Sequence, residues 1–180
     1  MFAAEIEKGL VLRLLEPRYA QALFSLIDRN REHLGIWFPW VELTKTVADS
    51  ETFIRSQLEK FVRDNGFQLG IWLNDELIGS IGLNYIIKEF RCTETGYWLG
   101  EEYGGRGMMT KACRHLCGYL FTELNLNRVE IRCAETNVKS RKVPERLGFT
   151  LEGKLRQMGY TREGLVDYLI YSLLRSEWQS

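Results

Sequence analysis

A glycine-rich turn between a β-patterned run and an amphipathic helix decides the fold of this chain. The turn reads Gly100-Glu101-Glu102-Tyr103-Gly104-Gly105-Arg106-Gly107. It follows the run 92–99 and precedes a helix whose apolar residues keep helical spacing from Met109 to Leu124. Closely spaced glycines let the backbone approach a ligand, and the first N–H groups of a helix have no intrahelical acceptor. We therefore expect this junction to bind a phosphate group, with Arg106 as an added cation.

Two other phosphate-binding motifs do not fit the same turn. A P-loop requires Gly-Lys-Ser/Thr at its end, but Gly107 is followed by two methionines. A dinucleotide fingerprint needs a third glycine where Thr110 stands, and it follows the first strand of a βαβ unit. A turn that merely connects a strand to a helix remains the plain alternative.

The rest of the chain alternates between strand-like and helix-like periodicity, with no repeat or linker. Before the turn we expect a strand at 10–15, helices at 17–29 and 48–63, and strands at 67–73 and 77–86 joined in a hairpin by Asn74-Asp75-Glu76. After helix 109–124 we expect a strand at 128–134, a short helix at 140–147, and closing strands at 149–155 and 168–174. A meander followed by strands interleaved with helices predicts an α+β fold with a mixed sheet.

Length, charge and cysteine content narrow the class of protein. A chain of 180 residues fits a single domain spanning 1–180. The 24 basic side chains balance the 24 acidic ones, so we expect no direct binding to nucleic acid or to an anionic membrane. Without a signal peptide or a membrane span, the four cysteines suggest reduced thiols in a cytoplasmic protein. No metal site is expected, because His115 would point away from the helix face that carries Cys113 and Cys117.

Four motifs together resemble the GNAT superfamily of N-acetyltransferases. They are Gly104-Gly105-Arg106-Gly107-Met108-Met109, Gly96-Tyr97-Trp98-Leu99, Asn137-x-x-Ser140 and Leu147-Gly148-Phe149. The first matches the family's pyrophosphate-binding pattern Gln/Arg-x-x-Gly-x-Gly/Ala and departs from it at Gly104 and Met109. Met109 is common in the RimL-type branch, which acetylates the N-termini of ribosomal proteins, and the other motifs are similar to the same branch. The resemblance extends from the first predicted strand to the last.

The resemblance implies a fold, a coenzyme and the residues that bind it. The GNAT fold has a mixed, mostly antiparallel central sheet of about seven strands flanked by helices, splayed in the middle to hold CoA. The pantetheine arm of acetyl-CoA, the acetyl donor, would lie between the strands 94–99 and 128–134. The implied coenzyme-binding residues are Leu99, Gly104, Gly105, Arg106, Gly107, Met108, Met109, Asn137 and Arg146. For Arg146, a solvated face is the ordinary alternative to a contact with the 3′-phosphate.

The resemblance also implies direct attack of an amine on the thioester. The chain has two histidines and no evident Ser-His-Asp constellation, in agreement with a route that needs no acyl-enzyme. Ser140 would protonate the departing thiolate, and a backbone N–H near Leu99 would face the oxyanion. Glu94 is the candidate that receives the amine proton through water, with a solvated strand residue as its alternative. Some relatives carry a glutamate, which would orient a base water, where Gly159 stands. For Asn137, the alternative to a contact with the pantetheine is a cap on the short helix.

The absence of a strong base favours one class of acceptor. At pH 7 an α-amino group of pKa near 7.9 is roughly 10% neutral, whereas a lysine of pKa near 10.4 is about 0.04% neutral. We therefore expect a protein N-terminus as substrate, that of a ribosomal protein by resemblance. Trp37 and Trp40 either line the acceptor channel or fill the core or a contact in a homo-oligomer.

Two rival functions remain open. Acidic residues at the acceptor mouth, namely Glu42, Asp49 and Glu51, would suit a polyamine or an antibiotic amine. A domain that binds acetyl-CoA without catalysis would explain the missing carboxylate at Gly159.

Overall fold

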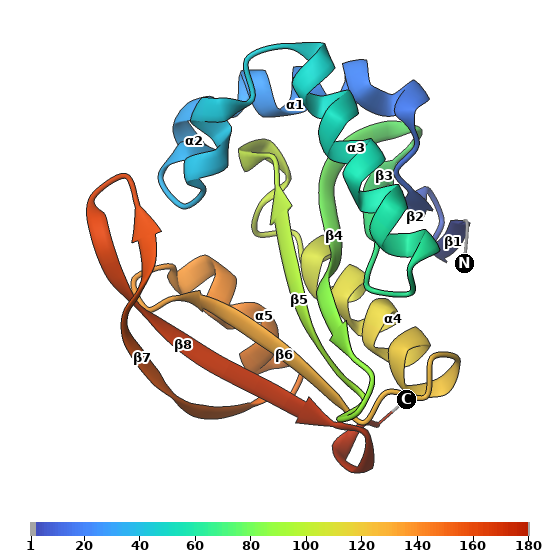
Figure 1. The fold of residues 1–180 in the computed structure, drawn as a ribbon, viewed down its shortest axis with the longest axis vertical. Coiled ribbons are helices and arrows are strands. Elements are labelled where there is room, and N and C mark those ends of the chain that lie inside the picture. Colours follow the sequence, from blue (N-terminus) through green and yellow to red (C-terminus); the bar gives the residue numbers. More distant parts are fainter. Residues whose placement is uncertain (1–2, 180) are drawn as a thin grey trace.

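The computed structural model describes residues 3–179, which form one eight-stranded sheet with helices on both faces (Figure 1). The strands are β1 (Ala3–Glu7), β2 (Leu10–Leu14), β3 (Gln68–Leu73), β4 (Glu76–Ile87), β5 (Cys92–Leu99), β6 (Arg128–Ala134), β7 (Thr150–Thr161) and β8 (Gly164–Leu174). Their order is β1-β2-β3-β4-β5-β6-β8-β7, and only β5 and β6 pair in parallel. The expected α+β fold with a mixed, mostly antiparallel sheet is confirmed. The sheet has eight strands rather than about seven because Ala3–Glu7 adds an edge strand to β2.

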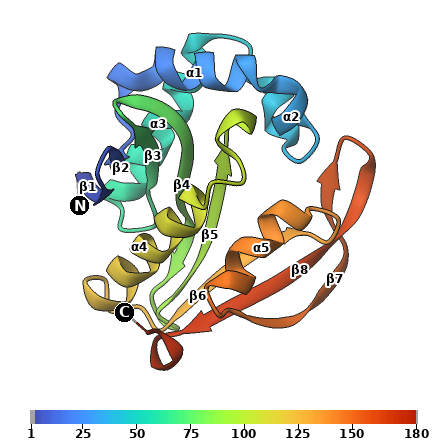
Figure 2. The same cartoon turned by 180° about the vertical axis from the view of Figure 1, so that it is seen from behind.

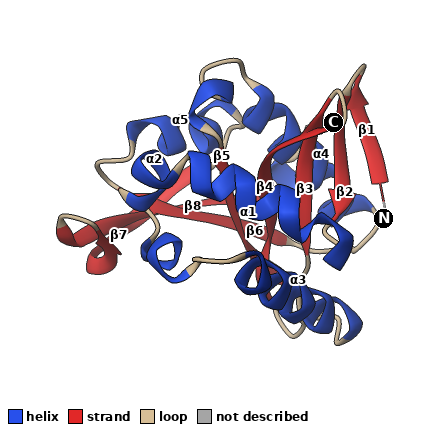
Figure 3. Ribbon diagram, turned by 90° about the horizontal axis from the view of Figure 1, so that it is seen from above, coloured by secondary structure: helices blue, strands red, loops and turns tan. Residues whose placement is uncertain are grey.

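The helices divide between the two faces of the sheet. They are α1 (Ala20–Arg29), α2 (Arg31–Gly35), α3 (Val47–Val62), α4 (Met108–Thr122) and α5 (Val138–Arg146), with 3-10 turns at Pro17–Tyr19, Pro39–Leu43, Glu101–Tyr103 and Arg175–Glu177. Helices α4 and α5 cover one face, as seen from behind in Figure 2, and α3 lies on the other in Figure 3. Each layer buries its own cluster of apolar side chains, one around α4 and one around α1 and α3.

Strands β5 and β6 separate in the middle of the sheet. They pair only at Cys92 with Arg128, Thr93 with Val129 and Glu94 with Glu130. Beyond Glu94 the two strands diverge, while β6 stays paired with β8 as far as Ala134. The two strands form a V in Figure 1, and Glu94, in the last β5–β6 pair, marks the vertex of the gap between them. This gap agrees with the splayed sheet expected from the resemblance.

Local signals in the sequence explain most element boundaries. Asn74 and Asp75 both adopt positive φ, 48° and 65°, which is the geometry of a tight two-residue hairpin turn. Helix α3 starts with a capping box in which Thr46 and Asp49 satisfy each other's backbone N–H groups. The hairpin and the amphipathic helices were therefore predictable from short stretches of chain.

The closing hairpin is much longer than the sequence suggests. Strand β7 continues to Thr161 and β8 begins at Gly164, where the expected strands were 149–155 and 168–174. An irregularity between Leu155 and Gly159, with Gln157 at a φ of 52°, interrupts the pairing and hides the second half of β7 from a period-two pattern. The short helix also begins earlier than expected, at Val138.

The tip of this hairpin contacts the opposite side of the gap. The backbone N–H of Arg162 donates to the carbonyl of Ile36 at 3.1 Å, and the Arg162 guanidinium lies 3.4 Å from the Glu42 carboxylate. Figure 1 shows the β7–β8 tip reaching toward α2. We call these contacts between Arg162, Ile36 and Glu42 the clasp. The two sides of the gap are thus joined at the vertex by strand pairing and at the far end by the clasp.

A partly exposed ion pair between β6 and β7 predicts that the stability of this part of the sheet is sensitive to acid. Arg128 donates to both carboxylate oxygens of Glu152, at 2.7 and 2.5 Å, and the Ser172 hydroxyl donates to one of them at 2.7 Å. Chiefly through the bond from Arg128, these contacts lower the pKa of Glu152 from 4.5 to about 2. A depressed carboxylate pKa stabilises the folded state above the unfolded pKa, and this stability is lost as pH falls.

Denaturant unfolding between about pH 5 and about pH 2 measures this loss. We expect Glu152→Gln to be less stable than the parent at pH 5 and the difference to shrink toward pH 2. Glu89→Gln is the control, because Glu89 is exposed and forms no ion pair within residues 3–179. Parallel stability curves for the parent and Glu152→Gln would contradict the assignment.

Candidate active site

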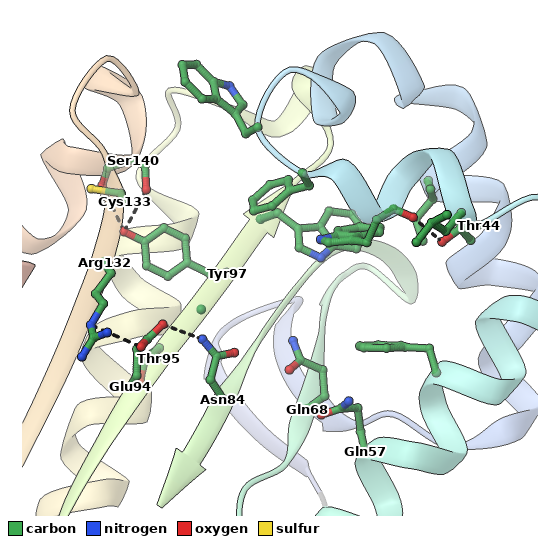
Figure 4. A pocket seen from close by; sticks show the side chains of 18 of the residues that line it. Thr44, Gln57, Gln68, Asn84, Glu94, Thr95, Tyr97, Arg132, Cys133 and Ser140 are labelled. Atoms are coloured by element: carbon green, nitrogen blue, oxygen red, sulfur yellow. Dashed lines mark hydrogen bonds and ion pairs between the residues drawn. The ribbon is translucent and has the colours of Figure 1, made fainter. Parts of the chain in front are cut away.

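A cavity of about 700 Å³ follows the gap between β5 and β6 (Figure 4). Its wall combines helices α1 and α3, the segment between α2 and α3, strands β3, β4, β5, β6 and β8, and the start of α5. The predicted site residues that line it are Trp37, Trp40, Glu94, Asn137 and Ser140. Residues distant in sequence therefore meet in one cavity.

The glycine turn presents an open backbone at the start of α4. Gly105 and Gly107 both have a φ of 77°, and a Cβ added to either would meet nothing within 4 Å. No residue of the described chain accepts a hydrogen bond from the N–H groups of Gly105, Gly107, Met108 or Met109. Met108 and Met109 bury their side chains in the core and so fix these amides in place. The turn has the geometry of an anion site at a helix N-terminus.

The two predicted basic residues lie on different elements, Arg106 in the turn and Arg146 at the end of α5. Arg106 is exposed, and Gly104 has an ordinary extended backbone, so it is not required by conformation. Arg146 is exposed in the last turn of α5 and does not line the cavity. The structure therefore brings Arg106 beside the predicted turn but leaves Arg146 outside the cavity wall.

A buried asparagine holds the start of the turn, and no local sequence pattern predicts this role. Asn30 is 4% exposed and caps neither neighbouring helix through its side chain. Its Nδ2 donates to the carbonyl of Leu26 at 3.0 Å, and its Oδ1 accepts from the N–H of Glu101 at 2.8 Å. Both polar ends of the side chain are thus satisfied, which is what burial of an amide requires. Asn30 connects α1 to the glycine turn.

Ser140 lies opposite Tyr97 across the gap. Asn137 Oδ1 accepts from the N–H of Ser140 at 3.0 Å, so Asn137 does cap α5. The Ser140 hydroxyl donates to Tyr97 Oη at 3.4 Å, and Tyr97 Oη donates to the Ser140 carbonyl at 3.0 Å (Figure 4). Burial raises the pKa of Tyr97 well above its usual value and that of Cys133, in the same cluster, to about 11. All three side chains therefore keep their protons at neutral pH.

Glu94 is held at the vertex of the gap by two partners. Asn84 Nδ2 donates to its Oε1 at 2.7 Å, and Arg132 Nε lies 3.4 Å from its Oε2 (Figure 4). Asn84 reaches it because it is the extra residue of a bulge between Leu83 and Tyr85. The side chain is 16% exposed, so it is only partly solvated in this position. Neither partner was predicted, because a bulge in one strand and pairing between distant strands leave no local pattern.

Two buried hydroxyls of the cavity wall have no hydrogen-bond partner among residues 3–179. Thr95 Oγ1 lies on β5 beside the gap, and Ser50 Oγ lies in the first turns of α3. Each residue is 1% exposed. Buried polar atoms are nearly always paired, so unpaired ones in a cavity wall suit a ligand that supplies polar groups. Both were missed, because Ser and Thr in regular elements give no such signal.

A neighbouring aromatic ring explains why position 159 has no side chain. A Cβ at this position would lie 1.8 Å from Cε1 of Tyr168, which stands on β8 and lines the cavity. Any side chain at position 159 would have to displace this ring. Tyr168 thus occupies the space beside Gly159 at the cavity wall.

The two predicted tryptophans belong to the aromatic side of the cavity. The ring centroid of Trp40 lies 5.6 Å from Phe38 and 6.0 Å from Trp98, and Trp37 lines the same wall. Leu99 is the last residue of β5, packs against the apolar cluster that contains α4, and does not line the cavity. Trp40 therefore packs against the apolar core and also lines the cavity. Whether the cavity is the acceptor channel stays a prediction.

Comparison with known families assigns the fold and its chemistry. A family model described as "Acetyltransferase (GNAT) domain" matches residues 9–150. The chain belongs to the GNAT acetyltransferases. This confirms the resemblance drawn from the glycine turn and makes the protein an acyltransferase. The transfer of an acetyl group is the reaction of the family.

Relatives of this GNAT chain include modifiers of ribosomal proteins. It is 40% identical to YdaF of Bacillus subtilis (strain 168), provisionally named a ribosomal N-acetyltransferase, over 99% of this chain and 98% of YdaF. It is 27% identical to the ribosomal-protein-serine acetyltransferase of Escherichia coli (strain K12), over 93% of this chain and 94% of that protein. A crystal structure of the microcin C7 self-immunity acetyltransferase MccE with acetyl-CoA and AMP superimposes with a TM-score of 0.89 at 26% identity, covering 94% of each chain. Homologous GNAT structures therefore bind the acetyl donor.

Residues 3–179 contain no group of three or more His, Cys, Asp or Glu placed to hold a metal ion. Within the same range, none of the helices has the length and apolar character needed to cross a membrane.

Proposed function

We propose that this protein transfers the acetyl group of acetyl-CoA to the N-terminal α-amino group of a protein, and that the acceptor is a ribosomal protein in the cytoplasm. The observation that carries this proposal is the divergence of β5 and β6 beyond Glu94, together with the free amides of the glycine turn that follows β5. The names of the relatives in Bacillus subtilis and Escherichia coli support a ribosomal acceptor. Residues 1–180 would form the single domain that does this.

The open backbone and the unpaired hydroxyl of Thr95 fit the coenzyme. The pyrophosphate would accept hydrogen bonds from Gly105, Gly107, Met108 and Met109, where no Cβ obstructs it. The pantetheine amides would pair with Thr95 and with polar groups of β6 exposed by the gap. Gly104 and Arg106 would border the phosphates, and Arg146 would reach the 3′-phosphate from outside the cavity. Asn137 would act mainly through its cap, which places Ser140.

The chain's own groups can complete direct attack of an amine on the thioester carbonyl. A backbone N–H at the gap edge near Leu99 would donate to the developing oxyanion. The nitrogen would lose its proton to water held at Glu94, whose carboxylate Asn84 and Arg132 keep in place. The Ser140 hydroxyl would donate its proton to the departing thiolate as the carbon–sulfur bond breaks, and it would regain a proton from solvent in the cavity.

The acidic residues considered for a polyamine are already engaged. Glu42 pairs with Arg162, Glu51 pairs with Arg55, and Asp49 accepts bonds from the N–H groups at the start of α3. They do not form a free acidic rim that would select a cationic small amine. An α-amino group, which is about 10% neutral at pH 7, suits a site with one carboxylate acting through water.

A competition among amines tests the proposal. The protein is incubated with acetyl-CoA and three acceptors: peptides with free N-termini taken from ribosomal proteins, the same peptides with blocked N-termini and an internal lysine, and a polyamine. Mass spectrometry should find acetylation at the free N-termini. Acetylation of only the polyamine would overturn the proposed substrate. Calorimetric binding of acetyl-CoA without turnover on any amine would instead support the non-catalytic alternative.

Ser140→Ala separates proton donation from coenzyme binding. We expect kcat to fall by about 100-fold, because the thiolate then leaves without a donor, while the Kd of CoA changes little. Steady-state kinetics and calorimetry measure the two quantities. Asn137 still caps α5 through the backbone N–H of residue 140, so the helix should remain intact. An unchanged kcat would remove Ser140 from the chemistry.

A further inference from the structure

Tyr97 is the residue that connects the two sides of the gap next to Ser140. It stands on β5, whereas Ser140 lies on α5, which follows β6. Strands β5 and β6 have already lost their pairing beyond Glu94 at this level of the sheet. The two hydrogen bonds between Tyr97 and Ser140 therefore cross a region where no backbone ladder holds the sides together.

The two bonds differ in what they can do. Tyr97 donates to the Ser140 carbonyl at 3.0 Å, which fixes the position of the first turn of α5 relative to β5. The Ser140 hydroxyl donates to Tyr97 Oη at 3.4 Å, which is long for an O–H···O bond and therefore weak. The first bond locates Ser140, and the second aims its hydroxyl into the gap while leaving the proton easy to redirect.

We infer that Tyr97 is a positioning residue that holds the Ser140 hydroxyl in place for the thiolate of the coenzyme. This inference deepens the proposed function and rests on it for the role of Ser140. Tyr97 does not give up its own proton. Its buried hydroxyl stays protonated, so that it remains a donor to the Ser140 carbonyl throughout the reaction.

Tyr97→Phe tests the inference because it removes one oxygen and leaves the ring in the core. We expect kcat to fall about tenfold, with the KM for acetyl-CoA nearly unchanged. In the Ser140→Ala background the same change should lower kcat no further, because Tyr97 acts through Ser140. An equal fall in both backgrounds, or no fall in the parent, would overturn the inference.

A second readout needs no acceptor and so separates this inference from the proposed function. The ultraviolet absorbance of the thiolate is followed with pH to titrate the thiol of bound CoA. The CoA-free protein is titrated in the same way as the reference. A donor beside the sulfur stabilises the thiolate, so Tyr97→Phe should raise the pKa of this thiol, and so should Ser140→Ala. The double variant should match Ser140→Ala alone. If the wild-type protein acetylates no N-terminus but the thiol pKa shifts in the three variants as expected, only the proposed function fails. A thiol pKa insensitive to Tyr97→Phe would overturn the positioning role.

Tyr119→Phe is the matched control. Tyr119 lies on α4 against Phe67, with ring centroids 6.3 Å apart, and does not line the cavity. Within residues 3–179 its hydroxyl has no hydrogen-bond partner. Thermal unfolding of both Phe variants shows whether either has lost its fold. A fall in kcat for Tyr119→Phe equal to that for Tyr97→Phe would indicate general loosening of the core and overturn the inference.

Discussion

Gly107→Val is expected to weaken CoA binding by about 100-fold, or about 2.7 kcal/mol. Gly107 has a φ of 77° and an open side, and it directly precedes the first residue of α4. A β-branched residue disfavours this left-handed conformation by about 1–3 kcal/mol, so the turn would relax and redirect the N–H of Met108. Its methyl groups would also fill the space where a pyrophosphate must approach. Calorimetric titration of CoA measures the loss.

Gly148→Val provides a control with the same local strain. Gly148 has a φ of 78°, and a Cβ there likewise meets nothing within 4 Å. It lies at the end of α5 instead of at the start of α4. Both variants should lose similar stability, but only Gly107→Val should lose CoA affinity. Equal CoA affinity in the two variants would show that the glycine turn is not the pyrophosphate site.

Gly159→Ala is expected to raise the KM for the acceptor by about tenfold, which corresponds to about 1.4 kcal/mol. The added Cβ would lie 1.8 Å from the Tyr168 ring, so the ring must move. Tyr168 lines the cavity in which we propose that the acceptor binds, so we expect a displaced ring to change the shape of that space. The KM for acetyl-CoA should change less, because the glycine turn is untouched. Steady-state kinetics with a peptide acceptor measure both constants.

A second substitution identifies the ring as the cause. The double variant Gly159→Ala/Tyr168→Ala should regain part of the acceptor affinity, because the displaced ring is gone. Gly153→Ala serves as the control on the same strand, since a Cβ there meets nothing within 4 Å. If Gly159→Ala keeps the parental KM, or if removal of the ring brings no recovery, Tyr168 does not shape the acceptor site.

Local patterns in the sequence were sufficient for the glycine turn, the amphipathic helices and the first hairpin. The turn at Gly105 and Gly107 needs positive φ, and Asn74-Asp75 favours a tight hairpin, so short-range conformational preferences determine both. Ser140 and Glu94 were predicted through resemblance, and the structure places them on the same cavity. Their roles stay predictions.

The contacts that hold these residues were not predictable. Asn30, Asn84 and Tyr97 each act on a partner from another element, and their sequence neighbourhoods carry no motif for it. The second half of β7 was missed because the irregularity before Gly159 breaks the period-two pattern. Long-range register and bulges determine such contacts, and a single sequence encodes them only through the complete fold.

The clasp has a consequence for which parts of a substrate protein can reach the cavity. Strand pairing at one end and Arg162 with Ile36 and Glu42 at the other make a closed ring of protein around the gap. A free chain end enters such a ring as a single segment of backbone. A lysine within a folded loop must bring in the two segments of backbone on either side of it. Selection for chain ends would then rest on steric exclusion as well as on the protonation state of the amine.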